Sequence, residues 1–171
     1  MLILFSPTRK NCNMNLPHQI ANHLKGVYFG GNWTSVDLKN TLSDVTWEQA
    51  VKKVDSFNTI AALTYHVSYY VTALLNVLHG EPLDAKDKYS FSHPSVGSEE
   101  EWHTLLNKAW ADAENCIALL ANMPESKLWE DFTDKKYGNY YDNITGIIEH
   151  IHYHLGQIVL IKKLVSQTLV L

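Results

Sequence analysis

Cysteine is scarce in this chain of 171 residues: only Cys12 and Cys116 occur, far apart and without a CxxC spacing. Two isolated cysteines suit neither a disulfide framework nor a thiolate zinc site. A chain of this length can bury a sufficient core without such crosslinks. We therefore expect a cytoplasmic protein folded as one domain over residues 14–171. Residues 1–13, which precede the first helical pattern, are expected to form a poorly ordered extension.

Long apolar runs and clusters of positive charge are also lacking. The apolar opening, residues 1–5, has no basic region before it and is too short for a secretory core. No later segment has the roughly 20 apolar residues that a membrane span requires. The formal net charge is -4, and no basic stripe could follow a phosphate backbone. We expect neither a membrane nor a nucleic-acid partner, and a small-molecule substrate fits this composition better.

Several catalytic motifs are missing from the sequence. There is no GxSxG elbow, no GxGxxG turn and no P-loop, which disfavours an α/β hydrolase, a dinucleotide-binding protein and a P-loop nucleotide hydrolase. Cys116 lies in an apolar stripe, where a thiol is usually inert. The chemistry of this chain must therefore come from other residue types.

Helical periodicity is present in four long segments, and no segment alternates as a strand does. The expected helices cover residues 16–29, 58–78, 98–123 and 142–165, with Asp142 and Asn143 as cap candidates for the last. Thr46 and Gln49 form a capping-box pattern that predicts a short additional helix over residues 46–54. Long connections remain at residues 81–97 and 124–141. The sequence predicts an all-α four-helix bundle with long loops between its helices.

Histidine is concentrated near the end of the chain, in the stretch EHIHYHLGQ at residues 149–157. At about 100° per residue, His150 and His154 lie about 40° apart on one helix face, while His152 lies about 200° from both. His154 also occupies the buried stripe of its helix, where an imidazole needs a partner. Gln157 is interpreted as a packing residue, with hydrogen bonding to the site as the alternative.

His66 lies beside the apolar stripe of the second long helix, where a facing helix could bring His150 and His154 to meet it. Three neutral imidazoles can hold a divalent cation and leave a coordination position open, as in catalytic zinc sites. A competing interpretation is that helix histidines are simply hydrogen-bonded in the core or at its edge. Spacing alone does not separate these interpretations.

A di-iron site is a further possibility raised by two ExxH elements, at Glu100 to His103 and at Glu149 to His152. Such sites need an additional carboxylate from each of the other two helices. Neither residues 16–29 nor residues 58–78 contain Asp or Glu. The di-iron interpretation therefore fails on the number of ligands.

The stretches NTIAALTYHVSYY around His66 and HIHYHLGQI around His150 and His154 resemble the DinB/YfiT-like superfamily of metal-dependent four-helix proteins. GGNWTSVDLKNTLSDVTWEQA and LHGEPLDAKD resemble the connections that follow the first and second helices of that superfamily. The resemblance covers about residues 14–163. It implies a metal triad of His66, His150 and His154 that holds Zn or Ni, and homodimers are common among the relatives.

Characterised relatives in that superfamily include mycothiol-dependent maleylpyruvate isomerase and bacillithiol S-transferases. The resemblance thus implies a divalent-metal-dependent enzyme that activates a low-molecular-weight thiol or water for transfer or hydrolysis. One alternative is a non-catalytic metal-binding or stress-response interaction bundle, with Asp87 or His93 as a fourth ligand. A third interpretation has no metal, with the histidines satisfied by carboxylates and waters.

Overall fold

The computed structural model describes residues 15–167 of the chain. Its long helices are α1 (Leu16–Phe29), α4 (Ile60–Leu78), α5 (Glu99–Ala121) and α6 (Tyr140–Gln167). Two short helices, α2 (Leu38–Leu42) and α3 (Trp47–Val51), lie between α1 and α4. No strand occurs in this part of the chain, so the predicted all-α class is confirmed. The predicted extension at residues 1–13 lies outside the described residues.

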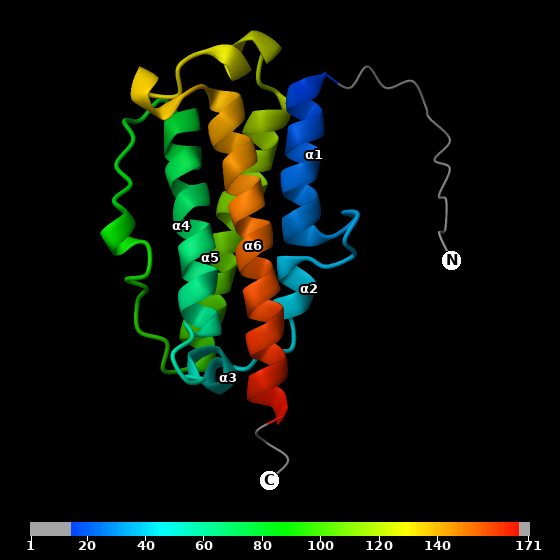
Figure 1. Cartoon of the computed structure of the whole chain (residues 1–171), viewed down its shortest axis with the longest axis vertical. Coiled ribbons are helices and arrows are strands. Elements are labelled where there is room, and N and C mark those ends of the chain that lie inside the picture. The colour runs from blue at the N-terminus through cyan, green and yellow to red at the C-terminus, as the bar shows by residue number, and fades with distance from the viewer. Residues whose placement is uncertain (1–14, 168–171) are drawn as a thin grey trace.

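The four long helices lie side by side around a shared core (Figure 1). α1 and α6 run in one direction, and α4 and α5 run in the other. α1 packs against α5, α5 against α4, α4 against α6, and α6 against α1. α4 and α6 are therefore antiparallel neighbours. Side chains from the middle of each can meet in their interface.

Side-chain caps explain where the long helices begin. Thr59 accepts a hydrogen bond from the backbone N–H of Ala62, and Ser98 accepts one from that of Glu101. α6 begins earlier than predicted, at Tyr140, because Asn139 Oδ1 accepts from the N–H of Asp142 at 2.8 Å. The predicted cap candidates at residues 142 and 143 thus lie within the first turn.

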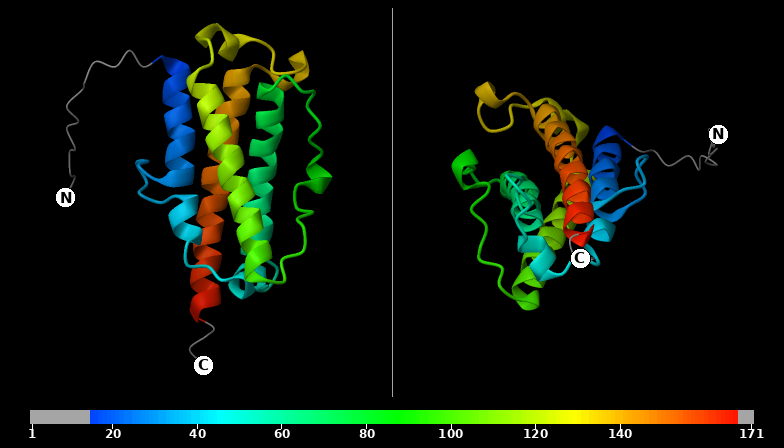
Figure 2. Two further views of the ribbon diagram at one scale, coloured as in Figure 1. Left: turned by 180° about the vertical axis from the view of Figure 1, so that it is seen from behind. Right: turned by 60° about the horizontal axis from the view of Figure 1, so that its bottom comes forward.

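The connection between α4 and α5, residues 81–97, runs back along the outside of the helices (Figure 2). It must span their length because α4 and α5 are parallel. We call this connection the strap; it contains one short 3₁₀ turn, η1 (Asp87–Tyr89). The other long connection also contains 3₁₀ turns, η2 (Glu125–Trp129) and η3 (Lys135–Tyr137). Both connections were predicted without secondary structure.

α2 packs against α1, and α3 packs against α4, α5 and α6. α3 is the short helix predicted from its capping box, in which Thr46 and Gln49 bond reciprocally. α2 was not predicted; Asp37 caps it by accepting from the backbone N–H of Asn40 at 2.9 Å. Lys162 of α6 is half-buried and donates to the carbonyl of Thr41 at 2.7 Å. This contact joins α6 to the end of α2.

Apolar side chains from all four long helices form one continuous core. Trp102 of α5 is fully buried, and its indole N–H donates to the carbonyl of Val45 at 2.9 Å. Among residues 15–167, no helix is both long and apolar enough to cross a membrane. The shared core holds the four long helices together. The hydrogen bond from Trp102 attaches the connection between α2 and α3 to that core.

Replacing Trp102 with Phe leaves the buried Val45 carbonyl without its donor. We expect the Trp102→Phe variant to lose about 1–3 kcal/mol in the free energy of unfolding, measured by urea denaturation. Trp33 is 98% exposed and provides the matched control. Trp33→Phe should change the free energy of unfolding by less than about 0.5 kcal/mol. Equal effects at both positions would contradict this role for Trp102.

Candidate metal centre

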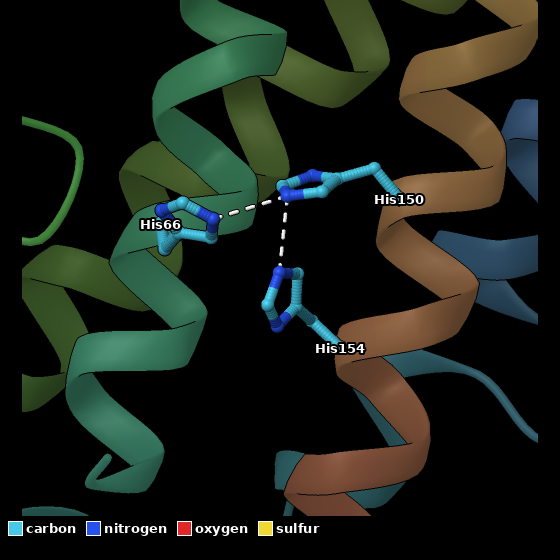
Figure 3. A group of neighbouring side chains, drawn as sticks. All are labelled: His66, His150 and His154. Carbon is cyan, nitrogen blue, oxygen red and sulfur yellow. Dashed lines mark hydrogen bonds between the residues drawn. The ribbon is translucent and has the colours of Figure 1, made fainter. Parts of the chain in front are cut away.

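Three imidazoles meet in the interface between α4 and α6 (Figure 3). His66 comes from the middle of α4, and His150 and His154 come from successive turns of α6. The Nε2 atom of His150 lies 3.0 Å from the Nε2 atoms of both His66 and His154. One nitrogen from each residue lies within 4.8 Å of the other two. The structure therefore brings together the three residues that the sequence singled out.

The spacing of these nitrogen atoms is close to that of a zinc site. Nitrogen ligands about 2.0–2.1 Å from a tetrahedral zinc ion lie about 3.3–3.4 Å from one another. The two 3.0 Å separations are slightly shorter than this value. All three nitrogen atoms lie within 4.8 Å of one another. Small side-chain rotations would bring them to the separations that zinc requires.

A hydroxyl on the strap fixes the orientation of His66. Ser90 is fully buried, and its Oγ lies 2.9 Å from Nδ1 of His66. The same hydroxyl donates its hydrogen to the carbonyl of Asp87 at 2.8 Å. Ser90 Oγ must therefore accept from His66, which places the ring proton on Nδ1. His66 Nε2 is left with a lone pair that points toward His150.

Gln157 acts on His154 in the same way. Its side-chain carbonyl, an acceptor only, lies 2.7 Å from Nδ1 of His154. In this orientation of the side chain, its amide nitrogen donates to the hydroxyl of Tyr153 at 3.1 Å. His154 therefore carries its proton on Nδ1 and a lone pair on Nε2. The interpretation of Gln157 as a packing residue is wrong.

The hydrogen-bond pattern leaves too few protons at the centre of the cluster. Two lone pairs, on His66 and His154, both face the Nε2 atom of His150. His150 can supply at most one N–H there when it is neutral. A cation between the three rings would accept all three lone pairs at once. The donor set thus fits a divalent metal better than it fits a closed hydrogen-bond network.

Burial keeps the three histidines neutral. The pKa of His150 falls from 6.5 to about 4, first because burial disfavours its charged form and then because protonated His154 and His66 would repel it. Burial likewise lowers the pKa values of His66 and His154. His66 is 5% exposed and His154 is 8% exposed. Neutral imidazoles at neutral pH are the form that binds metals.

Aromatic and acidic side chains surround the cluster. Phe91 of the strap stacks on His66 with ring centroids 3.8 Å apart. Tyr70 of α4 meets His150 edge-on, with centroids 5.0 Å apart, and its hydroxyl donates to Oδ1 of Asp87 at 2.6 Å. The negative charge of Asp87 favours the protonated forms of both His66 and His150. The strap therefore brings an apolar cover and a carboxylate close to the cluster.

The remaining histidines lie elsewhere. His152 points away, as predicted, and its ring packs against His23 of α1 at 5.7 Å between centroids. His103 pairs with Glu99 on the exposed side of α5. Within residues 15–167, the group of possible metal ligands consists of the three clustered histidines alone. Neither Asp87 nor His93 joins it, so the closed coordination sphere of the non-catalytic alternative is not formed by these residues.

Comparison with family models, curated proteins and solved structures found no match to this chain.

Sequence reasoning missed Ser90 and Phe91, which lie 24 and 25 positions after His66 in the chain. No periodicity exists in an irregular segment from which such a contact could be predicted. Only the path of the strap over α4 brings Ser90 to His66.

In metal-free protein, lowering the pH should destabilise the fold. The folded-state pKa of His150 lies below its ordinary value, so the unfolded chain takes up a proton first as the pH falls. The free energy of unfolding should therefore decrease from about pH 7 to about pH 4. Urea denaturation with a chelator present measures this dependence. The dependence should weaken in His150→Gln and stay unchanged in His79→Gln, a substitution outside the cluster; identical pH profiles for both variants would contradict the assignment.

Proposed function

We propose that His66, His150 and His154 hold a divalent cation, with Zn²⁺ or Ni²⁺ as the expected ion. The observation that carries this proposal is the proton deficit among the three Nε2 atoms, two of which have lone pairs fixed by Ser90 and Gln157. Three neutral imidazoles, two of them buried and that of His150 half-buried, without a carboxylate ligand match the nitrogen preference of zinc and nickel over calcium or magnesium.

The resemblance to the DinB/YfiT-like superfamily supports the same site. In this proposal the long helices form a four-helix bundle of that type, and the triad occupies the place that the resemblance implies. The antiparallel contact between α4 and α6 supports this arrangement. We also propose a cytoplasmic location and a homodimer, since homodimers are common in that superfamily.

We further propose that the chain is an enzyme that transfers a low-molecular-weight thiol to an electrophile, with water as an alternative nucleophile. A metal held by three protein ligands keeps a position open and lowers the pKa of a thiol or water bound there. The thiol loses its proton, sulfur forms a bond to an electrophilic carbon, and the leaving group departs with its electron pair. The transfer needs no oxidant.

The residues around the cluster suit such a reaction. Asp87 is exposed to solvent and lies on the strap beside the histidines, where its carboxylate can accept the proton that the thiol releases. Tyr70 holds that carboxylate through its hydroxyl. Phe91 covers His66 on one side and limits the access of water to the ring. These groups would place the proton acceptor beside the open position.

The direct test compares two histidines of α6. His154→Ala should weaken zinc binding by more than about a hundredfold, since even loss of a residue that orients a ligand costs about 10–100-fold. His152→Ala, two positions earlier and outside the cluster, should bind zinc as the unchanged protein does. Zinc content by mass spectrometry and chelator competition measure this difference.

The same pair of variants tests the enzyme proposal. Zinc-loaded protein should consume chlorodinitrobenzene together with at least one of several low-molecular-weight thiols, and His154→Ala should not. Full zinc content in His154→Ala would end the metal proposal. Tight zinc binding without turnover of any thiol would instead favour the non-catalytic alternative.

Ser90 should matter for metal affinity although it is not a ligand. Ser90→Ala removes the acceptor that holds the proton of His66 on Nδ1, and we expect zinc affinity to fall by about 10–100-fold. Ser92 lies on the same strap and is exposed, so Ser92→Ala is the matched control. Chelator competition measures both. Unchanged affinity in Ser90→Ala would show that Ser90 does not orient His66.

A further inference from the structure

A second cavity lies on another face of α4, between α4, α5 and the strap. Its volume is about 500 Å³, within the usual range for small-molecule sites. The lining side chains include Tyr65, Tyr69 and Thr72 of α4, Leu105 and Ala109 of α5, and Val96 of the strap. None of the three clustered histidines lines it.

Helix geometry separates this cavity from the histidines. Tyr65, Tyr69 and Thr72 follow one another at spacings of four and three, so they share a face of α4. His66 lies about 100° around the helix from Tyr65. The cavity and the candidate metal centre are therefore on different sides of α4, although the same strap covers both.

Small side chains leave the space open. Ala73 of α4 and Ala109 of α5 both line the cavity, where larger apolar residues would fill it. The ring of Tyr69 is held in place because its hydroxyl donates to the carbonyl of Lys86 at 3.2 Å and accepts from the Lys86 N–H at 2.8 Å. The ring of Tyr65 lies 6.2 Å from that of Tyr69. The anchored ring of Tyr69, the ring of Tyr65 beside it and the two small alanine side chains together form a preformed apolar site.

Three hydroxyl groups of the wall are already paired. The Ser68 hydroxyl donates to the carbonyl of Thr64 at 2.8 Å, and the Thr72 hydroxyl bonds Asp112 at 2.5 Å. The Tyr69 hydroxyl is occupied by the strap. A ligand in this cavity therefore meets ring faces and aliphatic groups more than free donors. Burial of its apolar surface would supply most of the binding free energy.

Charge at the edge of the cavity selects against anions. The lining includes the carboxylates of Asp84 and Glu101 and the ammonium group of Lys108. Lys108 is paired with Asp112 at 2.5 Å, so its charge is already compensated. Asp84 is likewise paired with Lys86 at 3.6 Å. The carboxylate of Glu101 therefore leaves the edge with an excess of negative charge, which disfavours an anionic ligand more than a neutral or cationic one.

We propose that this cavity binds a small aromatic or aliphatic molecule that carries no negative charge. The site is independent of the proposed metal centre. It gives the chain a second ligand, which would contact the strap on a different face of α4 from the histidines.

The test uses two fluorescent probes that share one aromatic framework. N-phenylnaphthylamine is neutral, and anilinonaphthalene sulfonate adds one negative charge to the same pair of ring systems. We expect the neutral probe to bind the full-length protein at one site, about tenfold or more tightly than the sulfonate. Glu101→Gln combined with Asp84→Asn should narrow that difference, since the amide at position 101 can still accept from the N–H of Gly97.

Filling the cavity should abolish the neutral probe's binding. Ala73→Phe puts a ring into the space, and Thr104→Phe narrows the edge from an exposed position of α5 that leaves the core intact. Each should weaken binding about tenfold or more. Ala111→Phe, on an exposed position of α5 outside the cavity, is the matched control and should bind as the unchanged protein does. Circular dichroism confirms that each variant is folded.

Two results would overturn the proposal. One is unchanged binding of the neutral probe in folded Thr104→Phe together with folded Ala73→Phe. The other is loss of probe binding in His154→Ala, which would place the probe at the histidines. Retained probe binding in that variant supports a separate site even if zinc binding fails, so the two proposals stand or fall independently.

Discussion

The contact between α4 and α6 around three imidazoles is the constraint on which the rest of this structure depends. A buried imidazole is costly unless its nitrogen atoms have partners, and here three of them share one point. Ser90 and Gln157 satisfy the outer nitrogen atoms of His66 and His154. The inner nitrogen atoms are left facing one another with too few protons, an arrangement that a shared cation would complete.

The strap contributes to both faces of α4. Around the histidines, Ser90 of the strap orients His66 and Phe91 stacks on its ring. Asp87 places a negative charge near His150. On the other face, Val96 closes the apolar cavity against α5. Tyr69 and Tyr70 are adjacent in sequence and anchor the strap at adjacent residues, Lys86 and Asp87. A parallel pair of helices requires a long connection, and this chain uses that connection to build its sites.

Much of this architecture follows from the sequence because helix periodicity is a strong local signal. The four long helices and the capping-box helix α3 are where the pattern predicts them, and helix geometry alone separates His152 from its two neighbours. The start of α6 was misplaced because several polar residues lie near it, and the side chain that accepts from its first turn belongs to Asn139. α2 is only five residues long, too short to show a period.

The outer partners of the histidines are harder to predict for a physical reason. Gln157 lies three positions after His154, a spacing that allows contact on a helix, yet glutamine at such a position more often faces solvent. Ser90 reaches His66 only through the tertiary path of an irregular segment. The side chain of Lys162 joins α6 to α2, which lie far apart in the sequence. Long-range contacts made by polar side chains carry no periodic signature.

X-ray absorption spectroscopy of the zinc-loaded protein tests the central claim most directly. The account predicts three imidazole nitrogen neighbours at about 2.0–2.1 Å and one further light-atom neighbour from solvent. A coordination shell with sulfur, or with fewer than three imidazoles, would contradict it, because the three clustered histidines could then not all be the ligands.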